Sequence, residues 1–594
     1  MCRIAGIYNN GLSGEKLKSL VEEMCLLQAH GGPDGKGLYT NEEYHLVLGH
    51  RRLSLIDLSN AAAQPMKYNN NRFVITYNGE LYNYLELKAT LKSAGCVFQT
   101  ESDTEVILAA FATWGTGAFE KFNGMFAFAL LDQQSGELYL VRDGIGIKPL
   151  YYAETVQGLV FASEVRAFKQ IDYLQEKNEN WPVYFMAYGH LPEPVTTLKR
   201  VKPLPKGTYL HYNLKSKTST ITSFGNYSFL EKIDNRKDAI ELTNELLKKS
   251  VERHLISDAP IGVFLSGGLD SSIIASLANQ VHDKINTISI YFEDNRYSEK
   301  KYQDLLQTRL SCDHHQHLIE EQQFHEFLPE IIMAMDLPSC DGINTWFISK
   351  YAKENGLKAV LSGIGGDELF GGYPSFDRIS MALKLQQMPN RILQASSFIN
   401  SKRFRRLSYL SIEGAVGRYL FLRGQFIPAE IASYLNATEA EVWRILKEQP
   451  VSNDINYLTP KNQASWLETN LYMQNQLLRD ADVFSMAHGV EIRVPFLDVD
   501  FVKLALKITS DVKYAGKLPK QLLIDTFKAL LPSEIWSRPK MGFTFPFKEW
   551  LQNDQYSSVT SNKDFQKYHT KMKTGDMHWS KFFAVLLMEN NNID

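Results

Sequence analysis

The cysteine at position 2 is the first residue whose type and place could do chemistry. Removal of Met1 would leave the Cys2 thiol and a free α-amine on one residue. An α-amine has a pKa of about 7.7–8.0, so it can act as a general base near neutral pH. A cysteine activated in this way attacks an amide and forms a thioester. Taken alone, a cysteine here is more often an ordinary buried side chain, so the nucleophile is a hypothesis that depends on the surrounding sequence.

A second reactive pattern is SGGLDSS at 266–272, which lies between the apolar run IGVFL and the helical pattern SSIIASLANQ. A loop between a strand and a helix directs backbone N–H groups and the helix N-terminus at an anion. Its glycines permit close backbone approach and its hydroxyls add donors: Ser266, Gly267, Gly268, Ser271 and Ser272. The loop lacks the GxxxxGK spacing of a Walker A motif. We therefore expect a phosphate-binding loop of another kind.

A third pattern, LSGIGGDELFGGY at 361–373, supplies a second glycine-rich loop at the end of a predicted strand. Ligands of open α/β sheets bind at the carboxyl ends of the strands, so the two loops are expected to face each other. Asp270 and Asp367 are then candidate Mg²⁺ ligands beside the phosphates, because hard cations prefer oxygen donors.

The elements that must position these residues change in kind along the chain. Up to about residue 225, short β-type runs such as RFVITYNGEL and GMFAFALLD are interrupted by helical patterns at EKLKSLVEEMCLLQA and DTEVILAAFATW. Strands and helices in separate runs predict layered α+β packing over 1–225. The segment 211–236 is polar and is interpreted as a linker. From 237 to 594, alternating strands and helices predict a parallel α/β sheet, with mostly helical structure over 375–480.

Composition narrows the classes of protein that fit. The chain has 594 residues, 44% of them hydrophobic and 22% charged, with a net charge of -3, so it is an ordinary globular protein without a nucleic-acid footprint. Its five cysteines have no CxxC spacing, which argues against a disulfide framework or zinc knuckle and favours a reducing compartment. The start, MCRIAGIYNNG, does not read as a signal peptide, and no apolar run approaches the roughly 20 residues of a membrane helix. We expect a cytoplasmic protein.

The N-terminal residues resemble the class II glutamine amidotransferases. MCRIAGIY, HGGPDGKG, GHRRLSLIDLS, YNGELYNY and TESDTEVIL follow one another in the order of that family. The resemblance implies an αββα N-terminal-nucleophile sandwich over 1–225, with Cys2 as nucleophile and Asn78 and the Gly79 N–H as oxyanion hole. It also implies that Arg52 binds the glutamine carboxylate, and that Glu80 and Asp103 bind its ammonium group. The alternative for Asn78-Gly79 is a type I′ hairpin turn.

Two positions depart from that family pattern. The family usually has His-Arg-Gly-Pro-Asp where this chain has Gly31, and a glycine where it has Arg3. Neither change removes the nucleophile or the oxyanion donors. Both bear on how the glutaminase site closes and communicates with the rest of the chain.

The SGGLDSS loop resembles the pyrophosphate loop of the ATP pyrophosphatases. Combined with the N-terminal motifs, and with MAHGVEIRVPFLD and RPKMGFTFPFKEW, it resembles the glutamine-hydrolysing asparagine synthetases over nearly the whole chain. The resemblance implies ATP and Mg²⁺ as cofactors, a homodimer, and an internal channel that carries ammonia between the sites. By position, it also implies further ATP-binding residues: Leu265, Ile290, Ser362, Gly363 and Lys520.

Two rival functions are considered beside the synthetase. A simple glutaminase with a degenerate second half would not need SGGLDSS and Asp367. A non-enzymatic interaction protein would not need Cys2 and the oxyanion residues. Both patterns are retained, so a synthetase that uses glutamine, ATP and a carboxylate acceptor is the prediction.

The acceptor is the part of the prediction that the motifs define least. Aspartate is the default by resemblance, but Ile364 stands where asparagine-forming members carry a glutamate suited to accept a proton from ammonia. The segment 336–347 also lacks the arginine that such members place there. Another carboxylate, Glu368 or Asp341, could serve as the proton acceptor. The alternative acceptor is a uronic acid in surface-polysaccharide synthesis.

Overall fold

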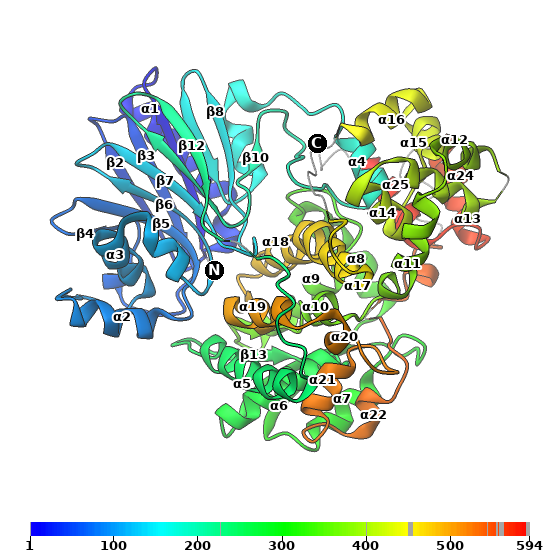
Figure 1. The fold of residues 1–594 in the computed structure, drawn as a ribbon. Helices are drawn as coiled ribbons and strands as arrows, with labels where there is room; N and C mark the ends of the chain where they lie inside the picture. The colour runs from blue at the N-terminus through cyan, green and yellow to red at the C-terminus, as the bar shows by residue number, and fades with distance from the viewer. Residues whose placement is uncertain are drawn as a thin grey trace.

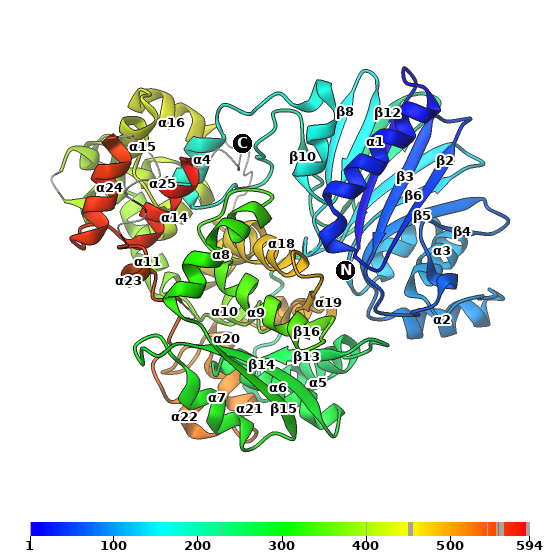
Figure 2. The ribbon, with the colours of Figure 1, turned by 180° about the vertical axis from the view of Figure 1, so that it is seen from behind.

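The computed structural model describes residues 2–225, 227–399, 401–448, 455–542, 544–553, 556 and 563–589. The N-terminal part contains two stacked β-sheets, and the C-terminal part contains one parallel sheet surrounded by helices (Figure 1 and Figure 2). Within the described residues, no helix combines the length and the apolar composition that crossing a bilayer requires.

The first sheet holds the strand that follows Cys2. Its six strands run in the order β10-β8-β9-β1-β3-β2, with bounds β1 Arg3–Asn9, β2 Gly35–Asn41, β3 Leu46–Arg52, β8 Tyr151–Thr155, β9 Gly158–Ala162 and β10 Lys202–Pro203. Helix α1 (Gly14–Leu27) packs on this sheet because Leu17, Val21 and Met24 recur at helical spacing and are buried. β1 is paired on both sides, by β3 and β9, so the residue before it is held firmly.

The second sheet stacks on the first and carries Asn78. Its order is β12-β11-β7-β6-β5-β4, with bounds β4 Met66–Tyr68, β5 Phe73–Glu80, β6 Met125–Asp132, β7 Glu137–Arg142, β11 Thr208–Asn213 and β12 Thr218–Ser223. Helices α2 (Tyr84–Ser93) and α3 (Asp103–Trp114) lie on the side away from the first sheet. Apolar residues from both sheets, such as Ile4 and Val74, form the core between them. The four layers confirm the predicted αββα sandwich.

The polar segment predicted as a linker begins later than expected. Residues up to Ser223 still form β11 and β12, and only the residues between β12 and helix α5 (Arg236–His254) connect the two halves. β12 is the edge strand of its sheet and all six of its residues are exposed, and five of the six are Ser or Thr. Polarity therefore did not distinguish an exposed edge strand from a linker.

The C-terminal sheet has five strands, all parallel, in the order β15-β14-β13-β16-β17. Its strands are β13 Ile261–Phe264, β14 Ile285–Tyr291, β15 Cys312–Leu318, β16 Ala359–Leu361 and β17 Glu491–Arg493. From β13 the chain proceeds outward to β14 and β15, and then returns to β16 on the other side. This confirms the predicted parallel sheet and creates a switch point between β13 and β16, where open α/β sheets bind ligands.

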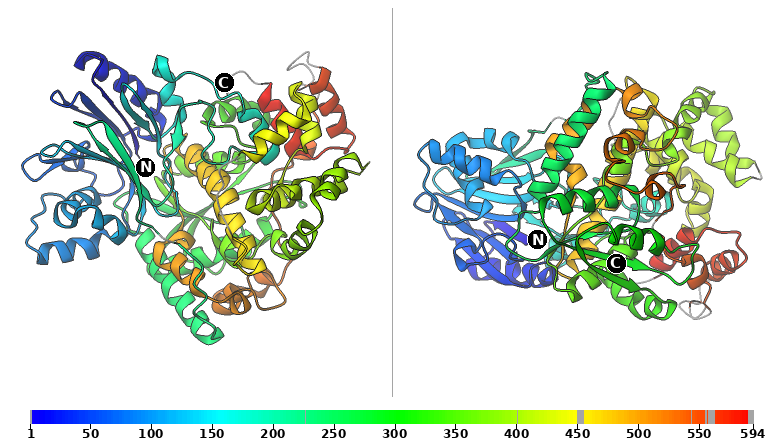
Figure 3. Two further views of the ribbon diagram at one scale, coloured as in Figure 1. Left: turned by 45° about the horizontal axis from the view of Figure 1, so that its top comes forward. Right: turned by 90° about the horizontal axis from the view of Figure 1, so that it is seen from below.

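Helices account for most of the remaining C-terminal half, including 375–480 as predicted (Figure 3). The helices near the sheet are α6 Leu269–Val281, α7 Lys300–Gln307, α8 Glu321–Ala334, α9 Ile343–Glu354 and α10 Gly366–Phe370. The middle group is α11 Ser375–Gln386, α12 Asn390–Ala395, α13 Lys402–Arg405, α14 Gly414–Arg423, α15 Pro428–Leu435, α16 Glu439–Lys447, α17 Pro460–Leu467 and α18 Arg479–Met486. The last group is α19 Val499–Lys507, α20 Ser510–Lys513, α21 Gln521–Phe527, α22 Ser533–Trp536, α23 Phe547–Trp550, α24 Lys563–Lys573 and α25 Trp579–Met588.

One helix from the first part of the sequence lies among the C-terminal helices. α4 (Trp181–Tyr188) packs against α15, α16 and α25 (Figure 1). The Tyr184 hydroxyl donates to the Ile445 carbonyl at 2.8 Å, and the Gln425 N–H donates to the Ala187 carbonyl at 2.8 Å. The two parts of the chain are therefore joined by more than the connecting segment.

Candidate active sites

Cys2 lies immediately before β1 and is buried. Its thiol is 3.8 Å from the Leu53 carbonyl oxygen, which accepts the thiol hydrogen. Burial raises the pKa of Cys2 to about 11, so the side chain is a thiol at neutral pH. A nucleophile in this state needs a base to remove its proton.

Asn78 and Gly79 lie inside β5 and pair with Ala127 and Phe126 of β6. The hairpin turn considered for this dipeptide is therefore wrong. Asn78 is fully buried, and neither its amide oxygen nor its amide nitrogen has a hydrogen-bond partner among the described residues. A buried amide without a partner is costly unless a ligand completes it. A Cβ at Gly79 would lie 2.2 Å from the Met125 carbonyl oxygen, so the backbone approach requires glycine.

The structure brings the other predicted glutamine-binding residues to the same end of the sandwich. β3 and β5 are joined across the sheets by the Thr76 hydroxyl, which donates to the Gly49 carbonyl at 3.0 Å. Arg52, at the end of β3, donates to the carbonyls of Asp57 and Ser59, at 2.5 and 2.8 Å. Asp103, the first residue of α3, accepts from the Leu81 N–H at 3.0 Å and is buried.

Glu80 is held by a residue of the C-terminal half. Its carboxylate lies 3.3 Å from a terminal nitrogen of Arg493, which in turn bonds Glu491 at 2.7 Å. Burial raises the pKa of Glu80, and the charge of Arg493 opposes the rise. The Arg493 carbonyl accepts from the Ser362 N–H at 2.8 Å. One residue of β17 thus contacts both the predicted glutamine site and the second glycine-rich loop.

Arg3 and Gly31, the two departures from the family pattern, are neighbours in space. A Cβ at Gly31 would lie 2.7 Å from the Arg3 Cγ, so the Arg3 side chain fills the space that a residue at position 31 would need. The fully buried guanidinium bonds Glu164 at 2.6 Å and Asp482 of α18 at 2.9 Å. The residue after the candidate nucleophile is therefore ion-paired to the C-terminal half.

The SGGLDSS loop follows β13 and leads into α6, as predicted. Gly267 has a φ of +82°, a conformation that favours glycine. The loop is braced from within, because the Gly268 N–H donates to the Ser266 hydroxyl at 3.2 Å and the Ser272 hydroxyl donates to the Gly268 carbonyl at 2.6 Å.

The two glycine-rich loops face each other, as predicted, because β13 and β16 are adjacent parallel strands. A Cβ at Gly363 would lie 2.9 Å from the Asp270 Cβ, and one at Gly366 would lie 2.5 Å from an Asp270 carboxylate oxygen. The glycines of the second loop therefore let its backbone approach the aspartate of the first.

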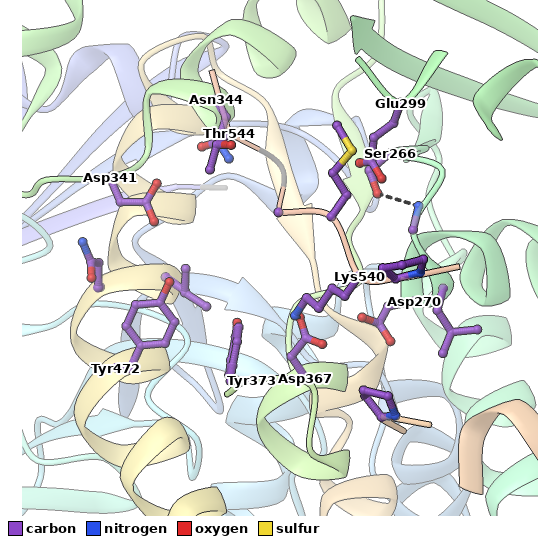
Figure 4. A pocket seen from close by; sticks show the side chains of 18 of the residues that line it. Ser266, Asp270, Glu299, Asp341, Asn344, Asp367, Tyr373, Tyr472, Lys540 and Thr544 are labelled. Atoms are coloured by element: carbon purple, nitrogen blue, oxygen red, sulfur yellow. Dashed lines mark hydrogen bonds and ion pairs between the residues drawn. The ribbon is translucent and has the colours of Figure 1, made fainter. Parts of the chain in front are cut away.

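Between the loops lies a cluster of opposite charges (Figure 4). The Lys520 ammonium lies 2.6 Å from Asp270 and 2.7 Å from Asp367, and the Lys540 ammonium lies 2.5 Å from Asp367. Burial works against the charged form of Asp367, but Lys520 and Lys540 outweigh it and lower its pKa to about 2. Burial raises the pKa of Asp270, which Lys520 opposes. The cluster offers cations to phosphates and carboxylates to a metal ion.

Two adjoining cavities, of about 500 and 270 Å³, open around this cluster. Among the predicted ATP-binding and Mg²⁺-binding residues, those that line one or both cavities are Ser266, Gly268, Asp270, Ser271, Ser362, Gly363, Asp367 and Lys520. Gly267, Ser272, Leu265 and Ile290 are buried and are not among the lining residues.

Ile364 lines the smaller cavity, and a carboxylate of the same loop lines it too. Glu368 is buried, accepts from the Gly365 N–H at 3.1 Å and accepts from the Tyr373 hydroxyl at 2.7 Å. Burial and the neighbouring Asp367 raise the pKa of Glu368 to about 7. A group with that pKa can exchange a proton near neutral pH.

Sequence reasoning missed three cations of these sites: Arg493, Lys540 and Arg538. Arg538 donates to the Gly267 carbonyl at 2.9 Å and pairs with Glu299, so it braces the first loop. All three occur in segments that carried the family resemblance. The residue types and spacing within those segments do not indicate which lysine or arginine side chain reaches a site.

Comparison with known proteins gives matches over both halves. Residues 242–571 match the family model described as Asparagine synthase, and residues 1–224 match the one described as Glutamine amidotransferase domain. The chain is 31% identical to glutamine-hydrolyzing asparagine synthetase 1 of Bacillus subtilis, over 100% of this chain and 94% of that protein. It is 28% identical to glutamine-hydrolyzing asparagine synthetase B of Escherichia coli, over 92% of this chain and 82% of that protein.

Proposed function

The chain belongs to the glutamine-hydrolysing asparagine synthetase family, and from this premise we propose that it makes asparagine from aspartate, glutamine and ATP. The observation that carries the proposal is the charge cluster of Asp270, Asp367, Lys520 and Lys540 between two facing glycine-rich loops. A simple glutaminase has no use for such a site. The curated relatives support the aspartate reading and give no support to a uronic acid acceptor.

In the first half-reaction, the Cys2 thiol adds to the side-chain amide carbon of glutamine. The α-amine freed by removal of Met1 takes the thiol proton, and Asn78 and the Gly79 N–H hold the oxyanion. The α-ammonium group returns this proton to the amide nitrogen, ammonia leaves, and water hydrolyses the thioester to glutamate and the free thiol. The partnerless amide of buried Asn78 supports this role, because a developing oxyanion would supply its missing acceptor. We propose that Arg52, Glu80 and Asp103 hold the α-carboxylate and α-ammonium groups of glutamine.

In the second half-reaction, the aspartate side-chain carboxylate attacks the α-phosphorus of ATP and releases pyrophosphate. We propose that Lys520 and Lys540, which both pair with Asp367, neutralise charge on the departing pyrophosphate. Ammonia then attacks the acyl carbon of the adenylate, AMP leaves, and the amide forms. We propose that Glu368 accepts the proton that the nitrogen loses, because Ile364 cannot and because a pKa of about 7 suits the task.

Asp270 and Asp367 would hold the Mg²⁺ that accompanies ATP. The donor set fits, because both groups are carboxylates and one oxygen of Asp270 is buried without a hydrogen-bond donor among the described residues. When bound, the ion would supply positive charge to the phosphates of ATP.

We propose a cytoplasmic enzyme, since each of the five cysteines is a free thiol, and a homodimer, by family analogy.

The test is a product balance with the purified chain, ATP, Mg²⁺, glutamine and aspartate. We expect asparagine, glutamate, AMP and pyrophosphate in equal amounts, and no asparagine when any one substrate is left out. Pyrophosphate release with a uronic acid or its nucleotide sugar, but none with aspartate, would contradict the proposal.

A further inference from the structure

The larger cavity contains a cation and a carboxylate that the steps above do not use. Arg423 is the last residue of α14, and Asp341 lies in the loop before α9. Both line the larger cavity, and Asp341 also lines the smaller one. Asp341 therefore stands where the two cavities meet, beside the loops that would bind the phosphates.

Arg423 is fixed in place but keeps part of its donor fork available. Its guanidinium carbon lies 3.7 Å from the centre of the Tyr472 ring and 4.6 Å from that of Tyr373, so the group is held between two aromatic rings. Its Nε lies 2.7 Å from a carboxylate oxygen of Glu468. No described residue accepts a hydrogen bond from its two terminal nitrogens. An arginine presents donors in a planar fork that matches a carboxylate.

Asp341 is also held by a hydrogen bond to one of its carboxylate oxygens, while the other oxygen has no hydrogen-bond donor among the described residues. One carboxylate oxygen accepts from the Gly342 N–H at 2.8 Å. Figure 4 shows the carboxylate pointing into the cavity, across from Asp367 and Lys540 and next to Asn344. Burial raises the pKa of Asp341 and the charge of Arg423 opposes the rise, so the two charges act on each other across this space.

An α-amino acid presents a carboxylate and an ammonium group on one carbon, and a site for it needs an arginine-like fork and an anion. We infer that Arg423 binds the α-carboxylate and Asp341 the α-ammonium group of the acceptor, which leaves its side-chain carboxylate free to reach the phosphates. This inference rests on the proposed function and names the acceptor site within it. It also supplies the cation that the segment 336–347 lacks, from a helix distant in the sequence.

The test compares three acceptors that share the reacting carboxylate. Aspartate carries both α-groups, β-alanine lacks the α-carboxylate, and succinate lacks the α-ammonium group. Pyrophosphate release is measured with ATP, Mg²⁺ and ammonia, so that the glutamine site is bypassed. We expect the parent enzyme to prefer aspartate over each analogue by about 10- to 100-fold in kcat/KM, which is the worth of a hydrogen bond to a charged group.

The variants are expected to give a crossed pattern. Arg423→Met loses most of the preference for aspartate over β-alanine and keeps the preference over succinate. Asp341→Asn does the reverse. Arg378→Met, on an exposed position of α11, is the matched control and leaves both preferences unchanged.

Arg423→Lys keeps the charge but loses the fork, so part of its preference over β-alanine should remain. It replaces the methionine variant if a melting curve shows that Arg423→Met does not fold. Equal losses with all three acceptors in both sets of variants would overturn the inference, because Arg423 would then act only through Glu468 and the tyrosines. A parent enzyme that releases no pyrophosphate with aspartate would instead refute the proposed function.

Discussion

Arg3 provides the most quantitative prediction, because its guanidinium is fully buried between two carboxylates. In Arg3→Ala, Glu164 keeps His30 at 3.0 Å and Arg166 at 2.9 Å, whereas Asp482 keeps only Lys148 at 3.8 Å among described cations. Removing one partner of a buried ion pair costs about 3–5 kcal/mol, because the other charge remains buried. For a unit the size of the N-terminal part, each 1 kcal/mol lowers the melting temperature by roughly 2–4 °C. We therefore expect the melting temperature of the N-terminal part to fall by on the order of 10 °C.

The same substitution is expected to loosen the coupling between the two half-reactions. Arg3 follows Cys2 directly, and its partner Asp482 lies two residues from Asp480, which lines the smaller cavity. The assay is the ratio of glutamate to asparagine formed, which should rise above one in Arg3→Ala.

The swap Arg3→Gly with Gly31→Arg is the control, because it returns a guanidinium to the same space from the opposite side. It should recover a large part of both the melting temperature and the coupling ratio. An Arg3→Ala enzyme that melts within about 2 °C of the parent, with an unchanged product ratio, would refute the reasoning.

Three further predictions concern the two reaction centres. The pH profile of kcat/KM for glutamine should rise with pH and level off above about 8, because the α-amine acts as a base only when it is deprotonated. The Cys2 thiol, with a pKa of about 11, does not ionise in that range. A rate that keeps rising to pH 11 would argue against the α-amine as the base. Asp270→Asn or Asp367→Asn should lower pyrophosphate release by at least about 100-fold while basal glutamine hydrolysis continues, and unchanged release in both would remove them from the ATP site. Asn78→Ala should lower kcat for glutamine hydrolysis by about 100- to 1,000-fold, the worth of one oxyanion donor, with ammonia-dependent synthesis as the internal control.

The fold could be predicted from the sequence wherever local pattern and packing agree. The runs that became β5, β6 and β14 are rich in apolar and β-branched residues and are bounded by turn residues, and the loops after β13 and β16 carry glycines that the close approach of Asp270 requires. Polarity failed at β12, because an exposed edge strand and a linker have the same composition. The sequence pattern also gave no indication of α4, which is buried on nearly all sides by helices that occur much later in the chain.

The site residues that belong to sequence motifs could be predicted, whereas those that reach the site through tertiary packing could not. Cys2, Asn78, Asp270 and Asp367 belong to motifs with a recognisable spacing. Arg493 and Arg423 reach their sites only because β17 pairs with β16 and α14 packs beside Tyr472. No local sequence pattern indicates such long-range tertiary contacts. The relation between Arg3 and Gly31 was visible only as two separate departures until the structure placed them in contact.

The central claim is that one chain releases ammonia at Cys2 and consumes it at a separate ATP-dependent site. The most direct measurement is asparagine formation by Cys2→Ala, supplied in parallel with glutamine or with ammonia. We predict no asparagine from glutamine and a rate close to that of the parent enzyme with ammonia, because the thiol is needed only to cleave the amide. Asparagine made from glutamine by the alanine variant, or a loss of the ammonia-dependent reaction in a folded variant, would contradict the claim.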